Sequence, residues 1–329
     1  MKRLLLGKVL CGVLALAMFG AAQGADTSCK GKKFIFFPGG SEGDSFASIV
    51  YRGAALAAKQ TGCDVEYVWS DWNPEKMVRQ FKEAIARNPT GISIMGHPGE
   101  PALAKLVDEA RSKGIIVTTA NVDLPQSEAK YKASGMGYVG QRLYDSGQSL
   151  GTAAVNVCKL KSGDSALVWG LLGQQGRGER TRGVVEALKA KGLKVEYLEI
   201  SDAVNKDPSQ GSPVFSAFAA KHRDLKLVVT DHGVLTATIP LFFKNAGVDA
   251  NKVCAAGFDL SSQTAAAIKA GTVKAVLDQQ PFLQGYLPVF QMYLTSTLGF
   301  SGLNVDTGAA IISKSNINVV EPLAREGLR

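Results

Sequence analysis

Histidine is scarce in this sequence, and its cysteines are far apart. Three histidines occur among 329 residues, at positions 97, 222 and 232, and no two of the five cysteines have CxxC spacing. Because structural zinc sites usually draw their ligands from closely spaced motifs, we expect no metal site. The scattered histidines suggest no catalytic triad, and no cofactor is expected.

Long apolar runs are also missing, apart from a short one at the start of the chain. Basic residues at positions 2, 3 and 8 precede the mostly apolar residues 9–19, and small residues follow. This order is typical of a secretory signal peptide, and the run is too short to span a bilayer. We therefore expect residues 1–25 to be removed and a soluble product to reach the periplasm. An uncleaved membrane anchor is the alternative.

Clustered positive charge is absent as well. The formal net charge is +8, of which basic residues 2, 3 and 8 contribute three, leaving +5 with no basic run. Nucleic-acid binding usually needs lysines and arginines gathered on one face, so none is expected. The length of the mature chain suggests two domains, each large enough to bury its own core.

Four cysteines remain after removal of the signal peptide, and export permits disulfides. They allow three full pairings. Cys29 directly precedes the first predicted strand and Cys63 the second, and these two strand starts are neighbours in a doubly wound sheet. A Cys29–Cys63 bridge is therefore expected on geometric grounds. Cys158–Cys254 is considered as a second bridge, without an independent argument.

Strand and helix patterns alternate along the whole mature chain, which is typical of parallel sheets covered by helices on both sides. Two similar halves emerge. In the first, we predict strands at 33–37, 65–69, 91–95, 115–120 and about 133–139, with helices at 46–61, 74–88 and 101–113. In the second, we predict strands at 165–169, 194–200, 225–230, 252–258 and 275–279, with helices at 143–158, 178–191, 214–221, 235–246 and 262–270.

The chain continues beyond the second half, with a helix predicted at 282–298 and a strand at 309–312. Crossings near residues 137–144, 279–281 and 308 would give a three-stranded hinge, which permits two domains to close on a ligand. The expected α/β fold thus has two doubly wound parallel-sheet domains. One contains residues 26–139 and 281–308, and the other residues 140–280 and 309–329.

Polar side chains follow many of the predicted strands. Open α/β sheets bind ligands beyond the carboxyl ends of their strands. Planar amide, carboxylate and guanidinium groups match vicinal hydroxyls, and aromatic rings cover the C–H face of a sugar. Each residue alone could be a helix cap or a turn residue, so the argument depends on their shared location. The set includes Asp44, Phe46, Trp72, Asn121, Arg180, Asp231, Asp259 and Gln279.

Four short motifs stand out: residues 118–121, the pair Arg180 and Gly183, residues 256–259, and residues 278–281 followed by Gly285. Together they resemble the motifs of the ribose-binding-protein-like family of periplasmic sugar-binding proteins. The similarity extends from about residue 33 to residue 312. It implies the periplasmic binding protein type I fold and capture of a monosaccharide or sugar alcohol between the domains. It also implies a monomer that delivers this ligand to the permease of an ABC transporter.

The resemblance also assigns roles to single residues. Asp44 matches a polar ligand contact of the family, and Phe46 matches an aromatic ring that covers the ligand. Asn121 matches a ligand contact after the fourth strand, and Arg180 matches an arginine that donates two hydrogen bonds to ligand oxygens. Asp231 and Asp259 match two further polar contacts, and Gln279 matches a glutamine beside the hinge.

Three positions depart from the family pattern. Ala47 stands where a second stacking phenylalanine is common, Asn121 replaces an aspartate, and Val122 stands where an arginine often follows. These differences put ribose itself in doubt as the ligand. Trp72 or Trp169 could supply the missing aromatic surface, although a core position suits Trp169 equally well.

The sequence also allows functions other than capture for transport. A ligand-sensing partner of a membrane receptor, for a sugar or a cyclic signalling molecule, would use the same cleft. An exported sugar-acting enzyme would need paired carboxylates, and Asp231 and Asp259 could form such a pair. Residues 135–140 match GxGxxG, but they lie within a predicted strand, which argues against dinucleotide binding. Residues 170–180 are glycine-rich but lack the Gly-Lys-Ser/Thr of a Walker loop.

Overall fold

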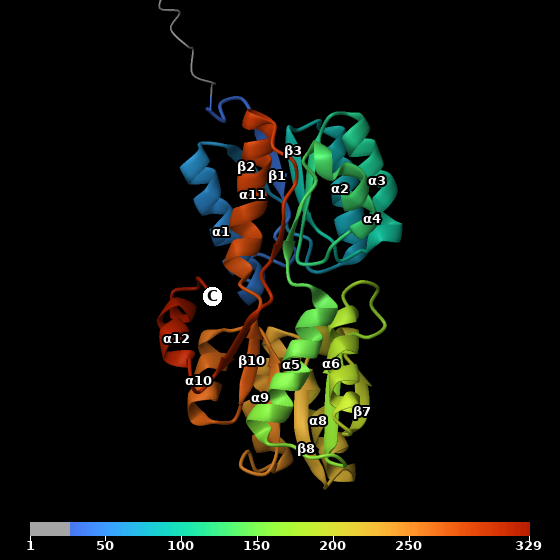
Figure 1. Cartoon of the computed structure of the whole chain (residues 1–329), viewed down its shortest axis with the longest axis vertical. Helices are drawn as coiled ribbons and strands as arrows, with labels where there is room; N and C mark the ends of the chain where they lie inside the picture. The colour runs from blue at the N-terminus through green and yellow to red at the C-terminus, as the bar shows by residue number, and fades with distance from the viewer. Residues whose placement is uncertain (1–26) are drawn as a thin grey trace, which may run out of the picture.

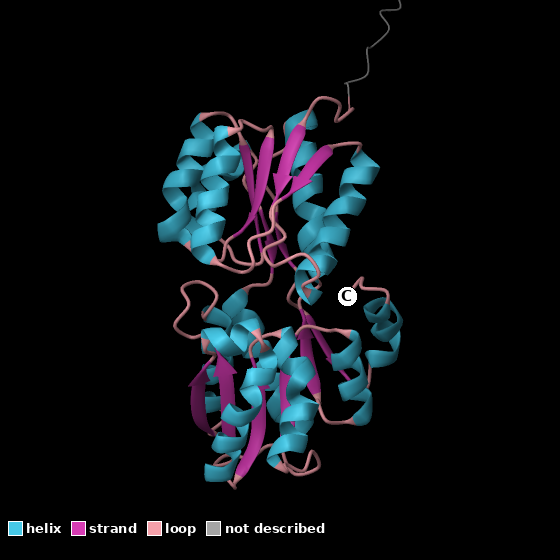
Figure 2. Ribbon diagram, turned by 180° about the vertical axis from the view of Figure 1, so that it is seen from behind, coloured by secondary structure: helices cyan, strands magenta, loops and turns pink. Residues whose placement is uncertain are grey.

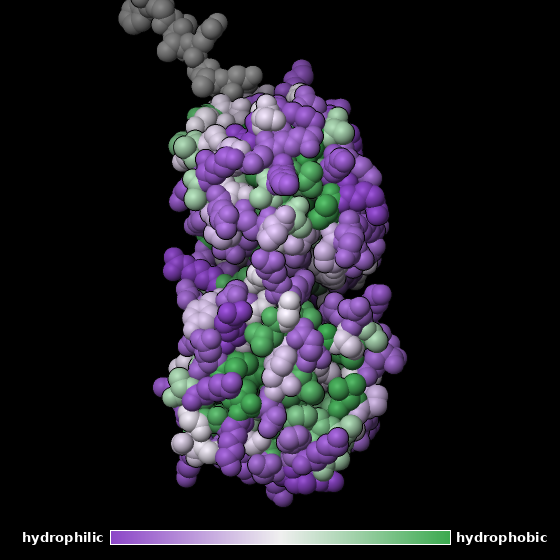
Figure 3. All heavy atoms as spheres, turned by 90° about the vertical axis from the view of Figure 1, so that its right-hand side faces the viewer, coloured by the Kyte–Doolittle hydropathy of each residue, from purple (hydrophilic) through white to green (hydrophobic). Residues whose placement is uncertain are grey.

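Two lobes, each built around a six-stranded sheet, make up the part of the chain that the computed structural model describes, residues 27–329 (Figure 1). The signal peptide expected at residues 1–25 lies outside the described residues. A space-filling view from the side shows the narrow waist between the lobes (Figure 3). Within residues 27–329, no helix combines the length and apolar character needed to cross a bilayer.

The first sheet is parallel throughout, with the strand order β11-β5-β4-β3-β1-β2. Every residue of its central strands β3 and β4 is buried because helices cover both faces; Ile92, Ile94 and Met95 of β3, for example, are fully buried. The strands are β1 (Lys33–Phe36), β2 (Asp64–Tyr67), β3 (Gly91–Met95), β4 (Ile116–Ala120), β5 (Tyr138–Gly140) and β11 (Asn304–Asp306).

The second sheet repeats this winding in the order β12-β10-β9-β8-β6-β7. The predicted pair of doubly wound sheets is therefore confirmed, with one exception. The last strand, β12, pairs with β10 in the antiparallel direction. The strands are β6 (Ser165–Gly170), β7 (Lys194–Glu199), β8 (Leu225–Thr230), β9 (Cys254–Phe258), β10 (Ala275–Asp278) and β12 (Ala310–Ser313).

In each lobe the strands lie between two layers of helices (Figure 2). In the first lobe, α1 and α11 lie side by side on one face of the sheet (Figure 1), and α2 and α3 cover the other. A Cβ atom on Gly285 of α11 would overlap the carbonyl oxygen of Val50 of α1, so only glycine permits this close approach. The helices of this lobe are α1 (Ser45–Thr61), α2 (Pro74–Ala86), α3 (Glu100–Ser112), α4 (Pro125–Tyr131) and α11 (Pro281–Leu298).

In the second lobe, α5 and α6 share one apolar core with the sheet, and α8, α9, α10 and α12 share the other. The predicted helix starts shift by a few residues; α9, for instance, begins at Gly233 and not at 235. The helices are α5 (Leu143–Cys158), α6 (Glu179–Ala190), α7 (Asp202–Lys206), α8 (Gly211–Lys221), α9 (Gly233–Ala246), α10 (Ser262–Ala270) and α12 (Ile317–Arg325).

One predicted strand is largely wrong. Residues 133–139 do not form a continuous strand, because Lys132–Ser134 form a 3-10 helix that ends at Gly135 with φ 99°, and β5 begins only at Tyr138. A left-handed glycine interrupts an extended run, so pairing can start only after it.

The chain crosses between the sheets three times. It leaves the first sheet after β5, returns after β10, and leaves again between β11 and β12. These connections lie together at the waist (Figure 1). The second crossing contains Gln280, a non-glycine residue with φ 54°. The three-stranded hinge of the periplasmic binding protein type I fold is therefore present.

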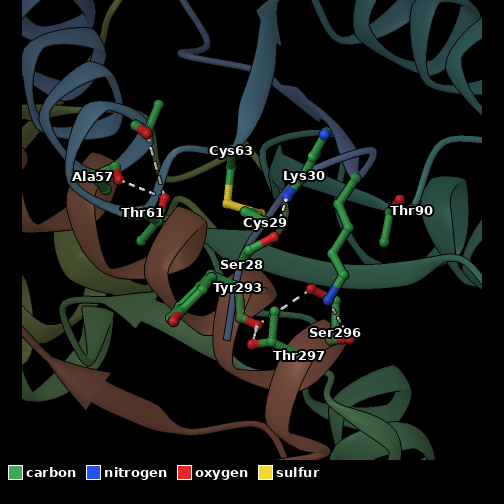
Figure 4. Close-up of a disulfide and its surroundings, with 12 residues drawn as sticks. Ser28, Cys29, Lys30, Ala57, Thr61, Cys63, Thr90, Tyr293, Ser296 and Thr297 are labelled. Carbon is green, nitrogen blue, oxygen red and sulfur yellow. Dashed lines mark hydrogen bonds between the residues drawn. A yellow bond between two sulfur atoms is a disulfide. The ribbon is translucent and has the colours of Figure 1, made fainter. Parts of the chain in front are cut away.

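Two disulfides are present, Cys29–Cys63 and Cys158–Cys254, with Cα–Cα distances of 4.8 and 6.0 Å. Both pairings considered from the sequence are thus formed. Figure 4 shows Cys29–Cys63 beside Tyr293 and Ser296 of α11. Each bridge lies at the amino-end side of a sheet, so neither touches the edge that faces the other lobe.

Candidate functional site

A cavity of about 480 Å³ lies between the lobes, at the carboxyl ends of strands from both sheets. Asn121 follows β4 in the first lobe, and His232 and Asp259 follow β8 and β9 in the second. A cavity of this volume is within the range of small-molecule sites. Its polar and aromatic lining includes Asp44, Phe46, Trp72, His97, Asn121, Gln174, Arg177, Arg180, Lys206, His232, Asp259, Gln263 and Gln279.

The structure brings seven of the eight predicted side chains to this lining. They are Asp44, Phe46, Trp72, Asn121, Arg180, Asp259 and Gln279. The eighth, Asp231, does not line the cavity and is buried behind Arg177 and Arg180. Trp169 lies in the core of the second lobe, 1% exposed and 5.6 Å from the ring centroid of Phe242, and does not reach the cavity.

Aromatic rings form the wall on the first lobe. The Trp72 ring lies 5.9 Å from the Phe46 centroid and 4.9 Å from that of His97. Trp72 packs against Gly40, where a Cβ would come within 2.8 Å of the indole nitrogen and 2.9 Å of Ala47 Cβ. Ala47 is fully buried beside this contact. Of the two tryptophans considered from the sequence, Trp72 is the one that lines the cavity.

Asp44 has two roles in this wall. Its Oδ1 accepts hydrogen bonds from the backbone amides of Phe46 and Ala47, at 3.0 and 2.7 Å, and caps α1. Its Oδ2 accepts a hydrogen bond from Trp72 Nε1 at 3.2 Å. The helix cap considered as an alternative for Asp44 is thus real, and it fixes a carboxylate beside the aromatic wall.

A network of amides and one carboxylate links the two lobes. Asn121 Nδ2 donates to Gln279 Oε1 at 2.8 Å and to Gln284 Oε1 at 2.9 Å. Gln279 Nε2 donates in turn to Asp259 Oδ1, and the amide of Gly233 donates to Asp259 Oδ2 at 2.8 Å. Asn121 and Asp259 both have positive φ values, 64° and 69°, which turn their side chains out of the strand direction.

Two arginines of the second lobe share one buried carboxylate. Arg180 Nε lies 3.0 Å from Asp231 Oδ1, and Arg177 Nη1 lies 2.9 Å from Asp231 Oδ2. Thr181 Oγ1 donates to the same carboxylate at 2.9 Å. The Arg180 guanidinium stacks 4.5 Å from the Phe258 ring, and its Nη1 is buried without a partner. A guanidinium that is fixed on one side and unpaired on the other can bond ligand oxygens without reorganisation.

Asp231 is not part of the lining, contrary to the prediction that it contacts the ligand. Both arginines cover its side chain, which is 1% exposed. Burial would raise the pKa of this carboxyl, but Arg177 and Arg180 hold the pKa well below its usual range. A glycosidase acid needs a raised pKa and access to its substrate. Asp231 and Asp259 therefore do not form the catalytic pair that was considered from the sequence.

Two histidines line the cavity in the neutral form. Burial, together with the charges of Arg177 and Arg180, lowers the pKa of His97 to about 3. Burial also lowers the pKa of His232, whose Nδ1 lies 3.7 Å from Asp231. The Nδ1 of His97 and both ring nitrogens of His232 are buried without hydrogen-bond partners. Neutral imidazoles can both donate and accept, as a hydroxyl-rich ligand requires.

The eight residues predicted from the sequence do not include His97, Arg177, Lys206 or His232. The sequence places His97, Arg177 and His232 in the polar segments that follow predicted strands, but it does not distinguish them from their neighbours. Arg177 lies in the loop before α6 and Lys206 at the end of the short helix α7, where no periodic pattern marks them. Within the described part of the chain, no group of three or more His, Cys, Asp or Glu side chains could hold a metal ion.

Two parallel-sheet lobes, three hinge connections and a polar cleft between the lobes define the class of two-lobed solute-binding proteins. The chain belongs to the family described as "Periplasmic binding protein domain", which matches residues 34–296.

A curated relative is the xylose/arabinose-binding protein XylF of Sulfolobus acidocaldarius, 29% identical over 275 residues. The match covers 77% of this chain and spans 65% of the relative's length. A carbohydrate transporter of Acidothermus cellulolyticus, solved with myo-inositol, is 25% identical with a TM-score of 0.76, over 91% of this chain and 99% of that one. A solute-binding protein of Burkholderia graminis, solved with D-arabinose, has a TM-score of 0.77 at 22% identity, over 88% and 98% of the two chains. These relatives are named as binding proteins or transporters, none as an enzyme.

Proposed function

We propose that this protein captures a monosaccharide or sugar alcohol in the cleft between its lobes, as the solute-binding component of an ABC transporter. The observation that carries the proposal is the composition of the cleft: paired polar groups from both lobes face one aromatic wall. The relatives named with xylose, arabinose and myo-inositol support the same ligand class.

The ligand would bind between two kinds of wall. Trp72 and Phe46 cover a C–H face of the ring, and Arg180 and Asp259 bond its hydroxyls from the other lobe. The hinge lets the lobes separate for entry and close again. Closure is favoured because only the closed form gives the ligand contacts from both lobes at once.

The signal-peptide pattern and the family also suggest where the protein works and with which partner. Residues 1–25 act as a cleavable signal peptide, and the mature protein works in the periplasm as a monomer. Its partner is the permease of an ABC importer in the inner membrane, which would receive the ligand from the closed form. The two disulfides suit an oxidising compartment.

A thermal-shift screen against pentoses, hexoses and alditols tests the ligand class, because a ligand that binds only the folded state raises the melting temperature. The best ligand is then titrated calorimetrically into variants. Arg180→Ala and Asp259→Ala should each weaken binding by about 1.5–3 kcal/mol, or roughly 10- to 150-fold, since each removes a hydrogen bond from a charged group.

Asp71→Ala is a matched control, because Asp71 lies outside the cavity and pairs with Lys76 on the surface. It should leave affinity unchanged. If no polyol stabilises the protein, or if both cleft variants bind the best ligand as tightly as wild type, the proposal is wrong.

A further inference from the structure

A second cavity, of about 380 Å³, lies at the amino ends of the strands in the second sheet, the edge opposite to the cleft. Its lining holds one acidic residue, Asp164, and an unusual number of basic ones. The basic residues are Lys159, Lys161, Lys226, Lys252 and Lys274.

The sheet topology explains why these lysines converge. Lys226 is the second residue of β8, Lys252 precedes β9 and Lys274 directly precedes β10. These three strands are consecutive neighbours in the sheet, and all run in the same direction. Lys159 and Lys161 follow α5, whose end reaches the same edge. Residues far apart in the sequence thus bring five lysines to the lining of one hollow.

The positive charge of this hollow is not neutralised. Across residues 27–329, no carboxylate lies within 4.0 Å of any of the five ammonium groups, whereas Lys76, Lys113 and Lys130 each form an ion pair. Asp164, the single acid, already accepts a hydrogen bond from the Lys161 backbone amide at 2.7 Å. Five like charges held close together repel one another, and a bound anion would relieve that repulsion.

A disulfide crosses the lining of the hollow. Cys158 and Cys254, which form it, both line the hollow and join the end of α5 to the first residue of β9. The bridge therefore holds together the two segments that carry Lys159 and Lys252. Lysine ammonium groups are point charges that bind phosphate oxygens without a demanding geometry.

We propose that this basic pocket binds a compact anion that carries more than one phosphate group. The inference is independent of the sugar-binding function, since the pocket and the cleft lie at opposite edges of the sheet. Such phosphate groups could belong to a soluble polyphosphate or to lipid headgroups at a membrane surface, and the chemistry of recognition is the same.

The test uses the full mature chain and inorganic tripolyphosphate as the probe, titrated calorimetrically at low and at moderate salt. Binding should be saturable and should weaken as salt rises, because the attraction is electrostatic. A variant with Lys226→Gln, Lys252→Gln and Lys274→Gln should bind at least about tenfold more weakly.

The matched control removes the same charge elsewhere. Lys59, Lys82 and Lys105 are exposed on helices of the first lobe, form no ion pair in the described structure, and can be changed to glutamine together. This control should bind tripolyphosphate within about twofold of wild type. Thermal unfolding of both variants checks that each is folded, and sugar affinity should be unchanged in both.

Co-sedimentation with phosphatidylglycerol vesicles, against phosphatidylcholine vesicles, separates the two sources. If the pocket variant loses binding to tripolyphosphate and the wild type does not bind vesicles, the ligand is a soluble anion. If the pocket variant loses binding to anionic vesicles, the ligand is a lipid headgroup. If the protein binds neither tripolyphosphate nor anionic vesicles, or if the pocket and control variants lose binding equally, the proposal is overturned.

Discussion

Replacing Asp231 by asparagine removes the one carboxylate that two buried arginines share. In the wild type, Arg177 and Arg180 contact this carboxylate at 2.9 and 3.0 Å, with side chains 10% and 1% exposed. Asparagine has nearly the same shape and keeps some hydrogen bonds, but it leaves two buried guanidinium groups without a counter-ion. The variant therefore tests charge compensation and not packing.

The expected loss of stability is large. Removing one partner of a buried ion pair costs about 3–5 kcal/mol. Since 1 kcal/mol corresponds to about 2–4 °C for a domain of this size, Asp231→Asn should lower the Tm of the ligand-free protein by on the order of 10 °C. Affinity for the cleft ligand should also fall, although Asp231 does not line the cavity, because Arg180 loses the group that orients it.

Urea unfolding and calorimetry of the ligand-free protein measure these changes. Asp71→Asn makes the same substitution in an ion pair whose side chains are 49% and 31% exposed, and should cost at most about 1 kcal/mol. Adding Arg177→Met to Asp231→Asn should recover part of the loss, since one unpaired charge disappears. A D231N protein as stable as D71N would refute the account of two arginines that depend on one carboxylate.

Three further predictions concern other parts of the molecule. The pKa of His97 is about 3 in the folded protein and 6.5 ordinarily, so between these pH values the unfolded chain binds a proton that the folded protein does not. The stability that depends on neutral His97 is present above pH 6.5 and is lost on acidification, by about 2 kcal/mol near pH 5. His97→Gln should therefore flatten the dependence of the unfolding free energy on pH. Gly285→Ala should cost about 1–3 kcal/mol by forcing α11 away from Val50 of α1, and an unchanged urea midpoint would mean that the helices do not depend on this contact. Cys158→Ser with Cys254→Ser opens a bridge between residues 96 positions apart and should cost about 2–5 kcal/mol in urea unfolding; coincidence with the wild-type curve would show that the bridge does not constrain the unfolded chain.

The long, strongly patterned elements could be predicted from the sequence, and the short ones could not. Helix α5 has the predicted bounds, and α2 begins at the predicted Pro74, because proline and the Asn73 cap mark its start locally. The strand β11 was missed: its three residues, Asn304–Asp306, are mostly exposed and show no apolar run. Its existence depends on pairing with β5, a contact between distant parts of the chain.

The location of the candidate site could be predicted from the sequence, but the sequence does not show which polar side chains line the cavity and which lie behind them. A strand end places Asp231 at the correct edge of the sheet, yet nothing local shows that Arg177 covers it. Arg177 belongs to a loop whose path is fixed by packing between the lobes; a Cβ on its neighbour Gly176 would lie 3.1 Å from Val122 of the first lobe. Which of two adjacent polar groups reaches a cavity is decided by such tertiary packing.

The three crossings between the lobes also impose an order in time on a chain made from its amino end. The first sheet gains its edge strand only when Asn304–Asp306 have been synthesised, and α11, which packs against α1, is made only shortly before. The second sheet is complete only after β12, which is made later still, has paired with β10. Neither core can be completed early, since the domains of a nascent chain fold only as their segments emerge. For the exported protein proposed above, the connectivity itself would help to keep the chain unfolded until most of it has been made.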